Sequence, residues 1–272
     1  MRPISLSALT VLPCSPLEQI DAAHAAGYDS VGLRLFPVMD TDIDVMAEPR
    51  LQQAIRDRLA QTGLNVFDVE VVRLTPGLDV PTLTPALEFA STLGARWLAV
   101  TSGAATEYSS GDEDECFRRL EQLCDLTAAN GMNVMLEFMV YRPIDTLEHA
   151  MRVATSVGHS HLGVTIDALH FFRSGGNPSM LARVDPKRLA CVQLCDAPAE
   201  PPADLPREAR YQRQYPGEGG LPLRELIAAV PADLPVCVEA PSRNYAHLSV
   251  EVRAKKGLRL THKILDSTDR TP

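Results

Sequence analysis

The segment "SPLEQIDAAHAAGYDSVGLRLF" (15–36) contains one complete helix–strand unit. Ser15 is a typical N-cap, Pro16 suits the first helical position and Gly27 suits the C-cap, so we expect a helix between these signals. The run "SVGLRLF" (30–36) then predicts a buried strand, because it is apolar and has strand length. A helix that ends in glycine and leads into a buried strand is typical of β/α units with parallel strands.

The same unit recurs along the whole chain. Further helical stretches are expected to end at Gly63, Gly94 and Gly131. Eight strand-like runs cover residues 4–11, 30–36, 65–74, 96–102, 133–139, 162–167, 189–196 and 235–242. Eight strands that alternate with helices over about 250 residues have the size of a (β/α)8 barrel. An open doubly wound sheet is the alternative, but no G-x-G-x-x-G follows the first strand.

We therefore predict an α/β fold with a single (β/α)8 TIM barrel. One domain is expected over residues 1–272, with the barrel at about 4–265 and a tail at 266–272. The segment 196–220 is rich in proline, and in a barrel it is a long loop after the seventh strand. Loops of that length are usually functional.

Composition and charge exclude several classes of protein. The formal net charge is −9, which disfavours binding to nucleic-acid phosphates and to anionic membranes. No apolar run reaches the roughly 18 residues of a transmembrane helix, and the first residues do not form a secretory signal. The six cysteines form no C-x-x-C pair, which indicates free thiols in a reducing compartment. We expect a cytoplasmic protein with neither nucleic-acid nor membrane partners.

Polar residues gather where the predicted strands end, which is where barrel active sites are built. Glu137, Asp167 and Glu239 each end an apolar run, and Gln193 interrupts the apolar run "ACVQLCDAP" (190–198). A single such carboxylate could instead cap a helix or pair with a nearby cation. Together they would converge on the barrel axis, where an uncompensated buried charge costs several kcal/mol. An all-oxygen set of this kind suits a hard divalent ion such as Mg2+ or Mn2+ better than structural zinc.

Other residues near these strand ends are candidates for substrate binding. Asp68 and Glu70 lie two apart on the third strand and hence on one face, and Arg73 follows them. Arginine can bind a carboxylate or phosphate through two hydrogen bonds. His170 lies just beyond the sixth strand, where it could instead be a loop histidine bonded to backbone. Further arginine candidates, which could equally be solvated surface residues, are Arg210, Arg213 and Arg243.

Five runs carry a family resemblance: "LEF" with Glu137, "DALH" with Asp167 and His170, "VQLCDAP" with Gln193, "YPGEGG" (215–220) and "VEAPS" with Glu239. Together they resemble the xylose isomerase-like TIM-barrel superfamily over nearly the whole chain. That superfamily includes sugar phosphate isomerases/epimerases, inosose dehydratases and endonuclease IV. The resemblance implies one divalent metal ion, Mn2+ or Mg2+ with Co2+ or Zn2+ as alternatives. The ligands that it implies are Glu137, Asp167, Gln193 and Glu239.

Gln193 departs from the common pattern of the superfamily, where most members have a histidine. A glutamine there resembles the 3-dehydroshikimate dehydratase branch. That branch also has an arginine after the third strand, a histidine three residues after the aspartate and a P-G-x-G-G loop, which match Arg73, His170 and the run at 215–220. The sequence around the third strand, "DVEVVRL", does not match that of the 3-dehydroshikimate dehydratase branch.

The chemistry that the resemblance implies is proton abstraction next to a carbonyl. The metal polarises the carbonyl oxygen, and a carboxylate removes the proton. We expect Glu137 and Glu239 to act as base and acid, and His170 to donate a hydrogen bond or to protonate a leaving hydroxyl. Expected contacts of the substrate are Glu70, Arg73, His170, Arg210 and Arg243.

These expectations favour a metal-dependent isomerase or epimerase in carbohydrate metabolism. Its substrate would be a sugar, a sugar phosphate or a related small polyhydroxylated ketone. The alternative is a 3-dehydroshikimate dehydratase-like lyase. The charge of −9 and the scarcity of histidines at the strand ends disfavour an endonuclease IV-like nuclease. The clustered carboxylates disfavour a non-catalytic binding barrel. By analogy with relatives, the chain is expected to form homo-oligomers.

Overall fold

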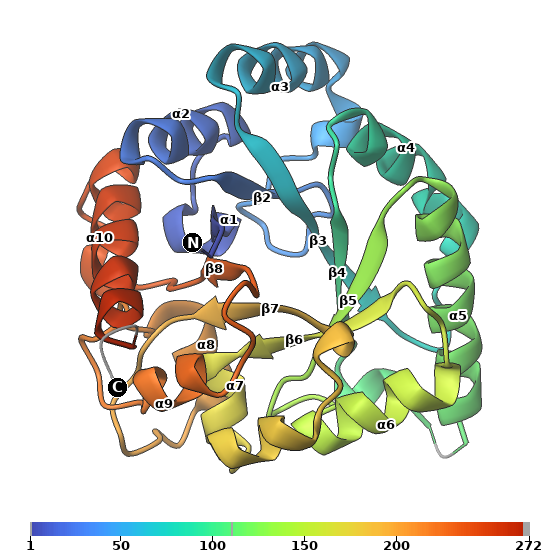
Figure 1. The fold of residues 1–272 in the computed structure, drawn as a ribbon. Helices are drawn as coiled ribbons and strands as arrows, with labels where there is room; N and C mark the ends of the chain where they lie inside the picture. The colour runs from blue at the N-terminus through green and yellow to red at the C-terminus, as the bar shows by residue number, and fades with distance from the viewer. Residues whose placement is uncertain (1, 110, 269–272) are drawn as a thin grey trace.

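Eight parallel strands close into a barrel in chain order, with β1 pairing β8 (Figure 1). The structure is a computed structural model that describes residues 2–109 and 111–268. The strands are β1 (Ile4–Leu6), β2 (Ser30–Arg34), β3 (Asn65–Leu74), β4 (Trp97–Ser102), β5 (Asn133–Glu137), β6 (Leu162–Asp167), β7 (Leu189–Leu194) and β8 (Val236–Val238). The predicted single TIM barrel is confirmed.

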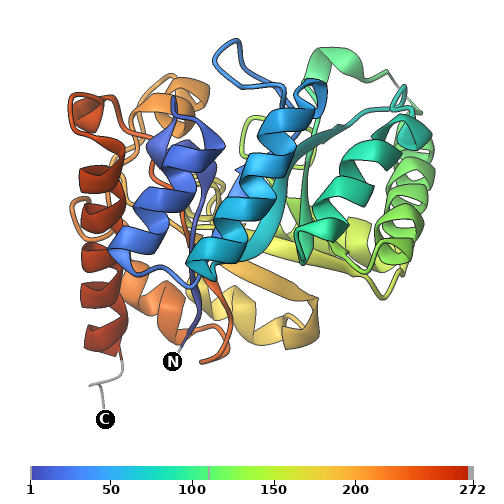
Figure 2. The same ribbon diagram turned by 90° about the horizontal axis from the view of Figure 1, so that it is seen from above.

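Helices surround the barrel on its outer side (Figure 1). They are α1 (Ala8–Val11), α2 (Pro16–Ala26), α3 (Pro49–Thr62), α4 (Thr84–Thr92), α5 (Glu113–Ala129), α6 (Leu147–Val157), α7 (Ala168–Arg173), α8 (Leu205–Tyr211), α9 (Leu223–Ala228) and α10 (Val250–Thr268). Short 3-10 turns are η1 (Val45–Ala47), η2 (Val80–Leu83), η3 (Ala105–Glu107), η4 (Pro178–Arg183), η5 (Pro186–Arg188) and η6 (Arg243–Tyr245). Figure 2 shows α10 beside α2 and α2 beside α3, so the last helix packs next to the first long one.

Local sequence signals explain the helix ends. Ser15 and Glu18 form a capping box, in which the Ser15 N–H donates to Glu18 Oε2 at 2.8 Å and the Glu18 N–H donates to Ser15 Oγ at 3.2 Å. Gly27 ends α2 with a φ of 95°, and Gly63 ends α3 with a φ of 69°. Both values lie in the left-handed region that glycine adopts without a steric penalty.

The strands expected at 30–36, 133–139, 189–196 and 235–242 end earlier in the structure, at Arg34, Glu137, Leu194 and Val238. The structure differs more from the sequence prediction in three segments. The expected strand at 4–11 stops at Leu6, and Ala8–Val11 forms α1, because a short apolar run does not distinguish a strand from a buried helical turn. The expected loop 196–220 contains α8, whose N-cap Asp204 accepts a hydrogen bond from the Arg207 N–H at 3.0 Å. Helix α10 continues to Thr268, so the tail expected from 266 is helical there, while 269–272 lie outside the described residues.

A buried layer inside the barrel supports the polar residues above it. Met135, Cys191 and Cys237 belong to one cluster that joins side chains of β3, β4, β5, β7 and β8, and such strands can share contacts only inside the barrel. Side chains two positions apart on a strand lie on the same face. The residues two positions after Met135, Cys191 and Cys237 are Glu137, Gln193 and Glu239. Their side chains therefore point into the barrel at the carboxyl end of the strands.

Two further expectations concern disulfide bonds and membrane-spanning helices. All six cysteines are free thiols in the structure, so no disulfide links the described residues. Within residues 2–109 and 111–268, no helix has both the length and the apolar character that crossing a membrane requires.

Candidate active site

The four residues expected to bind a metal lie at the same end of the barrel. Glu137 is the last residue of β5, Asp167 is the last of β6, Gln193 lies in β7 and Glu239 directly follows β8. The register pairs Asp167 with Gln193. All four side chains are buried. The strand ends thus bring together residues that are far apart in the sequence.

Three buried side-chain oxygens of this group lack a hydrogen-bond partner within the described residues. They are Glu137 Oε1, Gln193 Oε1 and Glu239 Oε2. A buried oxygen without a partner costs free energy, and native proteins rarely leave one unsatisfied. A divalent cation in contact with such oxygens would satisfy them, and carboxylate and amide oxygens are the ligands that hard cations prefer. The donor set therefore fits a divalent metal ion. Among the His, Cys, Asp and Glu side chains of the described residues, the candidate ligand atoms that lie within 4.8 Å of one another belong to Glu137, Asp167 and His170, and this group does not include Glu239.

Asp167 serves both the helix that follows it and the site. Its Oδ1 accepts a hydrogen bond from the His170 N–H at 2.9 Å, which caps α7, and its Oδ2 accepts one from Arg213 Nη1 at 2.5 Å. Burial acts to raise the pKa of Asp167, but Arg213 and His170 outweigh it, so the pKa lies below its ordinary value. Asp167 is therefore an anchored, ionised carboxylate.

Arg213 is a buried cation among the acidic side chains. Its Nη1 lies 3.6 Å from Glu239 Oε2 and also donates to the Glu239 carbonyl oxygen at 3.2 Å. Its Nε donates to the carbonyl oxygen of Ala209 in α8 at 2.9 Å, which holds the guanidinium against the last turn of that helix. From the sequence Arg213 was a candidate for binding substrate directly. In the structure it makes ion pairs with two of the expected metal ligands.

Glu137 and Glu239 are carboxyl groups in an environment that disfavours their charged forms. Burial raises the pKa of both well above the ordinary value. Repulsion from neighbouring carboxylates adds to this shift, although Arg213 opposes it. Positive charge placed between the two carboxylates would relieve the repulsion.

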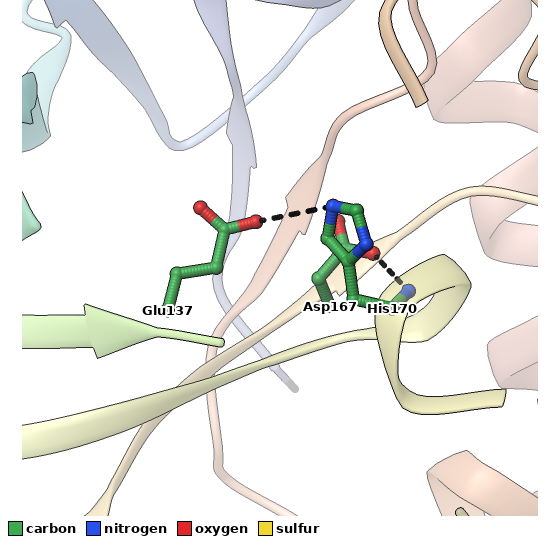
Figure 3. A group of neighbouring side chains, drawn as sticks. All are labelled: Glu137, Asp167 and His170. Atoms are coloured by element: carbon green, nitrogen blue, oxygen red, sulfur yellow. Dashed lines mark hydrogen bonds and ion pairs between the residues drawn. The ribbon is translucent and has the colours of Figure 1, made fainter. Parts of the chain in front are cut away.

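His170 lies next to Glu137 rather than in the open pocket. Its Nε2 is 4.0 Å from Glu137 Oε1, and Glu137, Asp167 and His170 each place one ligand atom within 4.8 Å of the others (Figure 3). The imidazole is fully buried and meets the edge of the Tyr141 ring at a centroid distance of 5.4 Å. Burial lowers the pKa of His170 to about 4, so the ring is neutral near pH 7.

A cavity of about 160 Å³ opens above these residues. The candidate site residues that line it are Glu70, Arg73, Glu137, Arg210, Arg213 and Glu239, whereas Asp167, Gln193 and His170 do not line it. The sequence reasoning missed Arg34, Tyr141, Arg142 and Tyr211, which also line it. Arg34 had a visible signal, since it is a charged residue in an otherwise apolar predicted strand.

Arg34 holds the acidic side of the cavity in place. Its Nη2 lies 3.4 Å from Glu70 Oε1, and its Nη1 lies 3.7 Å from Asp42 Oδ2. Deeper in the barrel, Asp68 fills space that Gly32 leaves open, because a Cβ on Gly32 would lie 2.5 Å from Asp68 Oδ1. Burial, with repulsion from Glu70, raises the pKa of Asp68 well above its ordinary value.

Arg243 belongs to an adjoining pocket of about 400 Å³ that shares Arg210 and Tyr211 with the first. Its guanidinium lies 4.2 Å from the centroid of the Tyr211 ring. Arg243 lines only this adjoining pocket, whereas Arg73 and Arg210 line the cavity that contains Glu137 and Glu239.

The glycine-rich run 215–220 is held against the end of β7. Asp196 accepts hydrogen bonds from the N–H groups of Ala197, Gly217 and Leu221 at 2.8, 3.0 and 3.0 Å. A Cβ at Gly219 would lie 2.3 Å from the Ala197 carbonyl oxygen, so the close approach requires glycine. This run has a clear structural role.

Comparison with known proteins places the chain among xylose isomerase-like TIM barrels. The family model described as "Xylose isomerase-like TIM barrel" matches residues 20–264. A 3-dehydroshikimate dehydratase of Pseudomonas aeruginosa is 25% identical over 253 residues, which cover 89% of this chain and 38% of that protein. An inosose isomerase of Bacillus subtilis is 26% identical over 113 residues, which cover 41% of this chain and 40% of that protein. The chain thus spans well under half the length of the dehydratase.

A solved structure supports the fold assignment independently. The crystal structure of the IOLI protein with a bound zinc atom superposes with a TM-score of 0.85 at 19% sequence identity. The superposition covers 99% of this chain and 100% of that chain. Likeness at this level of identity establishes the shared barrel.

Proposed function

The chain belongs to the family of xylose isomerase-like TIM barrels, and from this premise we propose that it is a divalent-metal-dependent isomerase or epimerase. In this proposal it removes a proton next to a carbonyl of a small polyhydroxylated keto substrate. The observation that carries the proposal is the set of three buried oxygens without a hydrogen-bond partner within the described residues, on Glu137, Gln193 and Glu239, beside the anchored carboxylate of Asp167.

Glu137, Asp167, Gln193 and Glu239 would hold the metal. Their all-oxygen donor set favours Mn2+ or Mg2+ over Co2+ or Zn2+. When bound, the ion supplies a Lewis acid that polarises the substrate carbonyl. The chain's own contribution is to hold these ligands in place, through the hydrogen bonds and the ion pair of Asp167.

Glu137 and Glu239 are the proposed proton-transfer groups. Both line the cavity, and they come from β5 and β8, which are not neighbours in the barrel. A substrate between them would present two faces to two carboxyl groups. One carboxylate would accept the proton from carbon and the other would return a proton, which is what isomerisation or epimerisation requires.

The surrounding polar groups would orient the substrate. Glu70, Arg73 and Arg210 line the cavity and would contact its hydroxyl or acidic groups. Arg243 would contact only a substrate long enough to enter the adjoining pocket. His170, with Nε2 4.0 Å from Glu137 Oε1 and 3.5 Å from Arg213 Nη2, would help to keep that carboxyl group in position.

A 3-dehydroshikimate dehydratase-like lyase is the second candidate, and it is supported equally. The match to a dehydratase extends over 89% of this chain, and Gln193 is the residue that resembles that branch. The first step, removal of a proton next to a carbonyl, is common to both candidates. They differ in the second step, where the lyase expels a hydroxyl group that Glu137 or Glu239 protonates, because the neutral His170 does not line the cavity.

One pair of assays separates the two candidates. Metal-depleted protein is reconstituted with Mn2+ or Mg2+ and incubated with a panel of ketoses in D2O, and deuterium in the recovered sugar is measured by mass spectrometry. In parallel it is incubated with 3-dehydroshikimate while the absorbance of an aromatic product is followed. Metal-dependent exchange into a ketose selects the isomerase, and aromatisation selects the lyase.

Variants test the proposed proton-transfer groups in whichever assay responds. Glu137→Gln and Glu239→Gln are each expected to lower kcat by at least about 100-fold. Glu88→Gln, at an exposed position of α4, is the control and should leave turnover unchanged. Near-normal turnover in both site variants, or full turnover after removal of the metal, would contradict the proposal.

A further inference from the structure

Arg213 contacts the candidate metal ligands from the segment that follows α8. The residue is buried, with 2% of its surface exposed. Two of its hydrogen bonds go to backbone: Nε donates to the Ala209 carbonyl oxygen at 2.9 Å, and Nη1 donates to the Glu239 carbonyl oxygen at 3.2 Å. Two further contacts go to carboxylate oxygens, because Nη1 lies 2.5 Å from Asp167 Oδ2 and 3.6 Å from Glu239 Oε2. One nitrogen of Arg213 thus contacts both carboxylates.

These two carboxylate oxygens are atoms that a metal ion would also need. Asp167 Oδ1 accepts the hydrogen bond that caps α7, and Oδ2 faces Arg213. Glu239 Oε2 has no hydrogen-bond partner within the described residues, although it is ion-paired with Arg213. Mg2+ binds carboxylate oxygens at about 2.1 Å, so an ion bound to both oxygens would lie close to Nη1. Positive charges at such a distance repel each other strongly in a buried site.

Glu239 stands apart from the other acidic groups of the site. Glu137, Asp167 and His170 place ligand atoms within 4.8 Å of one another, and Glu239 is not part of that group. Arg213 binds Glu239 through both its carboxylate and its carbonyl oxygen. Arg213 thus holds one expected ligand outside the compact group that the others form.

The balance of charge allows Arg213 to stay near the site when an ion binds. Glu137, Asp167 and Glu239 are buried, and three ionised carboxylates balance one divalent ion together with one guanidinium. Binding of an ion therefore does not require Arg213 to leave. It requires only that Nη1 releases the two oxygens that the ion takes. The hydrogen bond from Nε to Ala209 involves no expected ligand atom and can remain.

We propose that the Arg213 guanidinium and the divalent ion compete for Asp167 Oδ2 and Glu239 Oε2. Before the ion binds, the ion pairs of Arg213 hold these carboxylates in place. When it binds, Nη1 leaves both oxygens while Nε keeps its bond to Ala209. Arg213 is thus a positioning residue that sets the affinity of the site for the metal. The inference rests on the proposed function, because it takes Asp167 and Glu239 as metal ligands.

A purely structural role for Arg213 predicts the opposite change in metal affinity. If Arg213 only anchors the two carboxylates, its removal loosens the ligands and weakens binding of the metal. If Arg213 competes with the ion, its removal strengthens binding, because the ion no longer meets a positive charge at these oxygens. The direction of the change therefore distinguishes the two roles.

Calorimetric titration of metal-depleted protein with Mn2+ at about pH 8, where proton competition for the carboxylates is reduced, measures this change without requiring turnover. Arg213→Met removes the charge and keeps an unbranched side chain. It should bind Mn2+ at least about 10-fold more tightly than the wild type. Arg207→Met is the matched control, because Arg207 is exposed on α8 and lines neither pocket of the site. It changes the net charge equally, and its affinity should stay within about 2-fold of the wild type, since exposed charges are screened.

Crystal structures of the wild type with and without Mn2+ test the competition without any substitution. They decide the question even if Arg213→Met does not fold. With Mn2+ bound, Nη1 should lie beyond hydrogen-bond distance from Asp167 Oδ2, at more than about 3.5 Å. Without Mn2+, the two atoms should be in contact.

Two results would overturn the inference: Mn2+ affinity of Arg213→Met that is equal to or lower than that of the wild type, or a contact between Nη1 and Asp167 Oδ2 that persists with Mn2+ bound. Either result could occur together with metal-dependent deuterium exchange into a ketose, in which case the proposed function stands and the competition does not. Tighter Mn2+ binding by Arg213→Met, in a protein that catalyses neither reaction, would uphold the competition and contradict the proposed function.

Discussion

Thr10 connects the start of the barrel to the strand end that carries Glu239. Its hydroxyl donates to the Val238 carbonyl oxygen at 2.7 Å and accepts from the Ala240 N–H at 2.9 Å. These two backbone groups flank Glu239, and Thr10 is fully buried. The substitution Thr10→Val keeps the shape of the side chain and removes both hydrogen bonds.

The expected loss of stability depends on which hydrogen bonds the Val238 carbonyl oxygen and the Ala240 N–H retain in the variant. The Val238 carbonyl oxygen still accepts a hydrogen bond from the Ser7 N–H at 3.1 Å, so its loss is about 0.5 kcal/mol. The buried Ala240 N–H loses its partner, which costs about 1–3 kcal/mol. The sum of about 2 kcal/mol corresponds to a fall in Tm of roughly 4–8 °C for a chain of this size.

Thermal unfolding followed by circular dichroism measures this change. Thr155→Val is the control, because Thr155 is exposed on α6 and its hydroxyl bonds only to the Met151 carbonyl oxygen of the same helix. The control should change stability by no more than about 0.5 kcal/mol. If Thr10→Val melted at the wild-type temperature, Thr10 would not hold the end of β8, and the reasoning would be refuted.

Three further substitutions test other parts of the structure. Glu208→Gln removes the buried carboxylate that accepts hydrogen bonds from Arg173 at 2.7 and 2.9 Å. The free energy of unfolding, measured by urea denaturation, should fall by about 3–5 kcal/mol. A variant as stable as the wild type would contradict this. Gly32→Ala places a Cβ against the buried Asp68 side chain and should lower the free energy of unfolding by about 1–3 kcal/mol. Gly77→Ala is the control and should not lower it, because nothing lies within 4 Å of a Cβ at that position. Equal melting temperatures for the two variants would count against the contact between Gly32 and Asp68. Gln193→His should retain metal binding but raise the affinity for Zn2+ relative to Mg2+ in calorimetry, and unchanged selectivity would argue against Gln193 as a ligand.

The residues at the strand ends were predictable because the parallel strands of a barrel all run in the same direction. The expected runs 65–74 and 162–167 coincide with β3 and β6, and each is bounded by a clear change from apolar to polar or turn residues. Once the strands are assigned, Glu137 and Asp167 must lie at the same end of the barrel. The convergence of the expected ligands therefore follows from the order of the strands.

The partners contributed by loops were not predictable in the same way. Arg213 lies 46 residues from Asp167 in the sequence, and its ion pair depends on the path of the chain after α8. Arg142 lies in the segment after β5, where no periodic pattern indicates which way a side chain points. Helix α1 was missed because three of its four residues are apolar and continue the preceding strand pattern.

The central claim is that Glu137, Asp167, Gln193 and Glu239 bind one divalent metal ion. Anomalous X-ray diffraction from crystals soaked in Mn2+ locates the ion directly. The claim predicts one strong anomalous peak among the side-chain oxygens of these four residues. A protein that binds Mn2+ in solution but shows its anomalous peak elsewhere, with none among these residues, would contradict it.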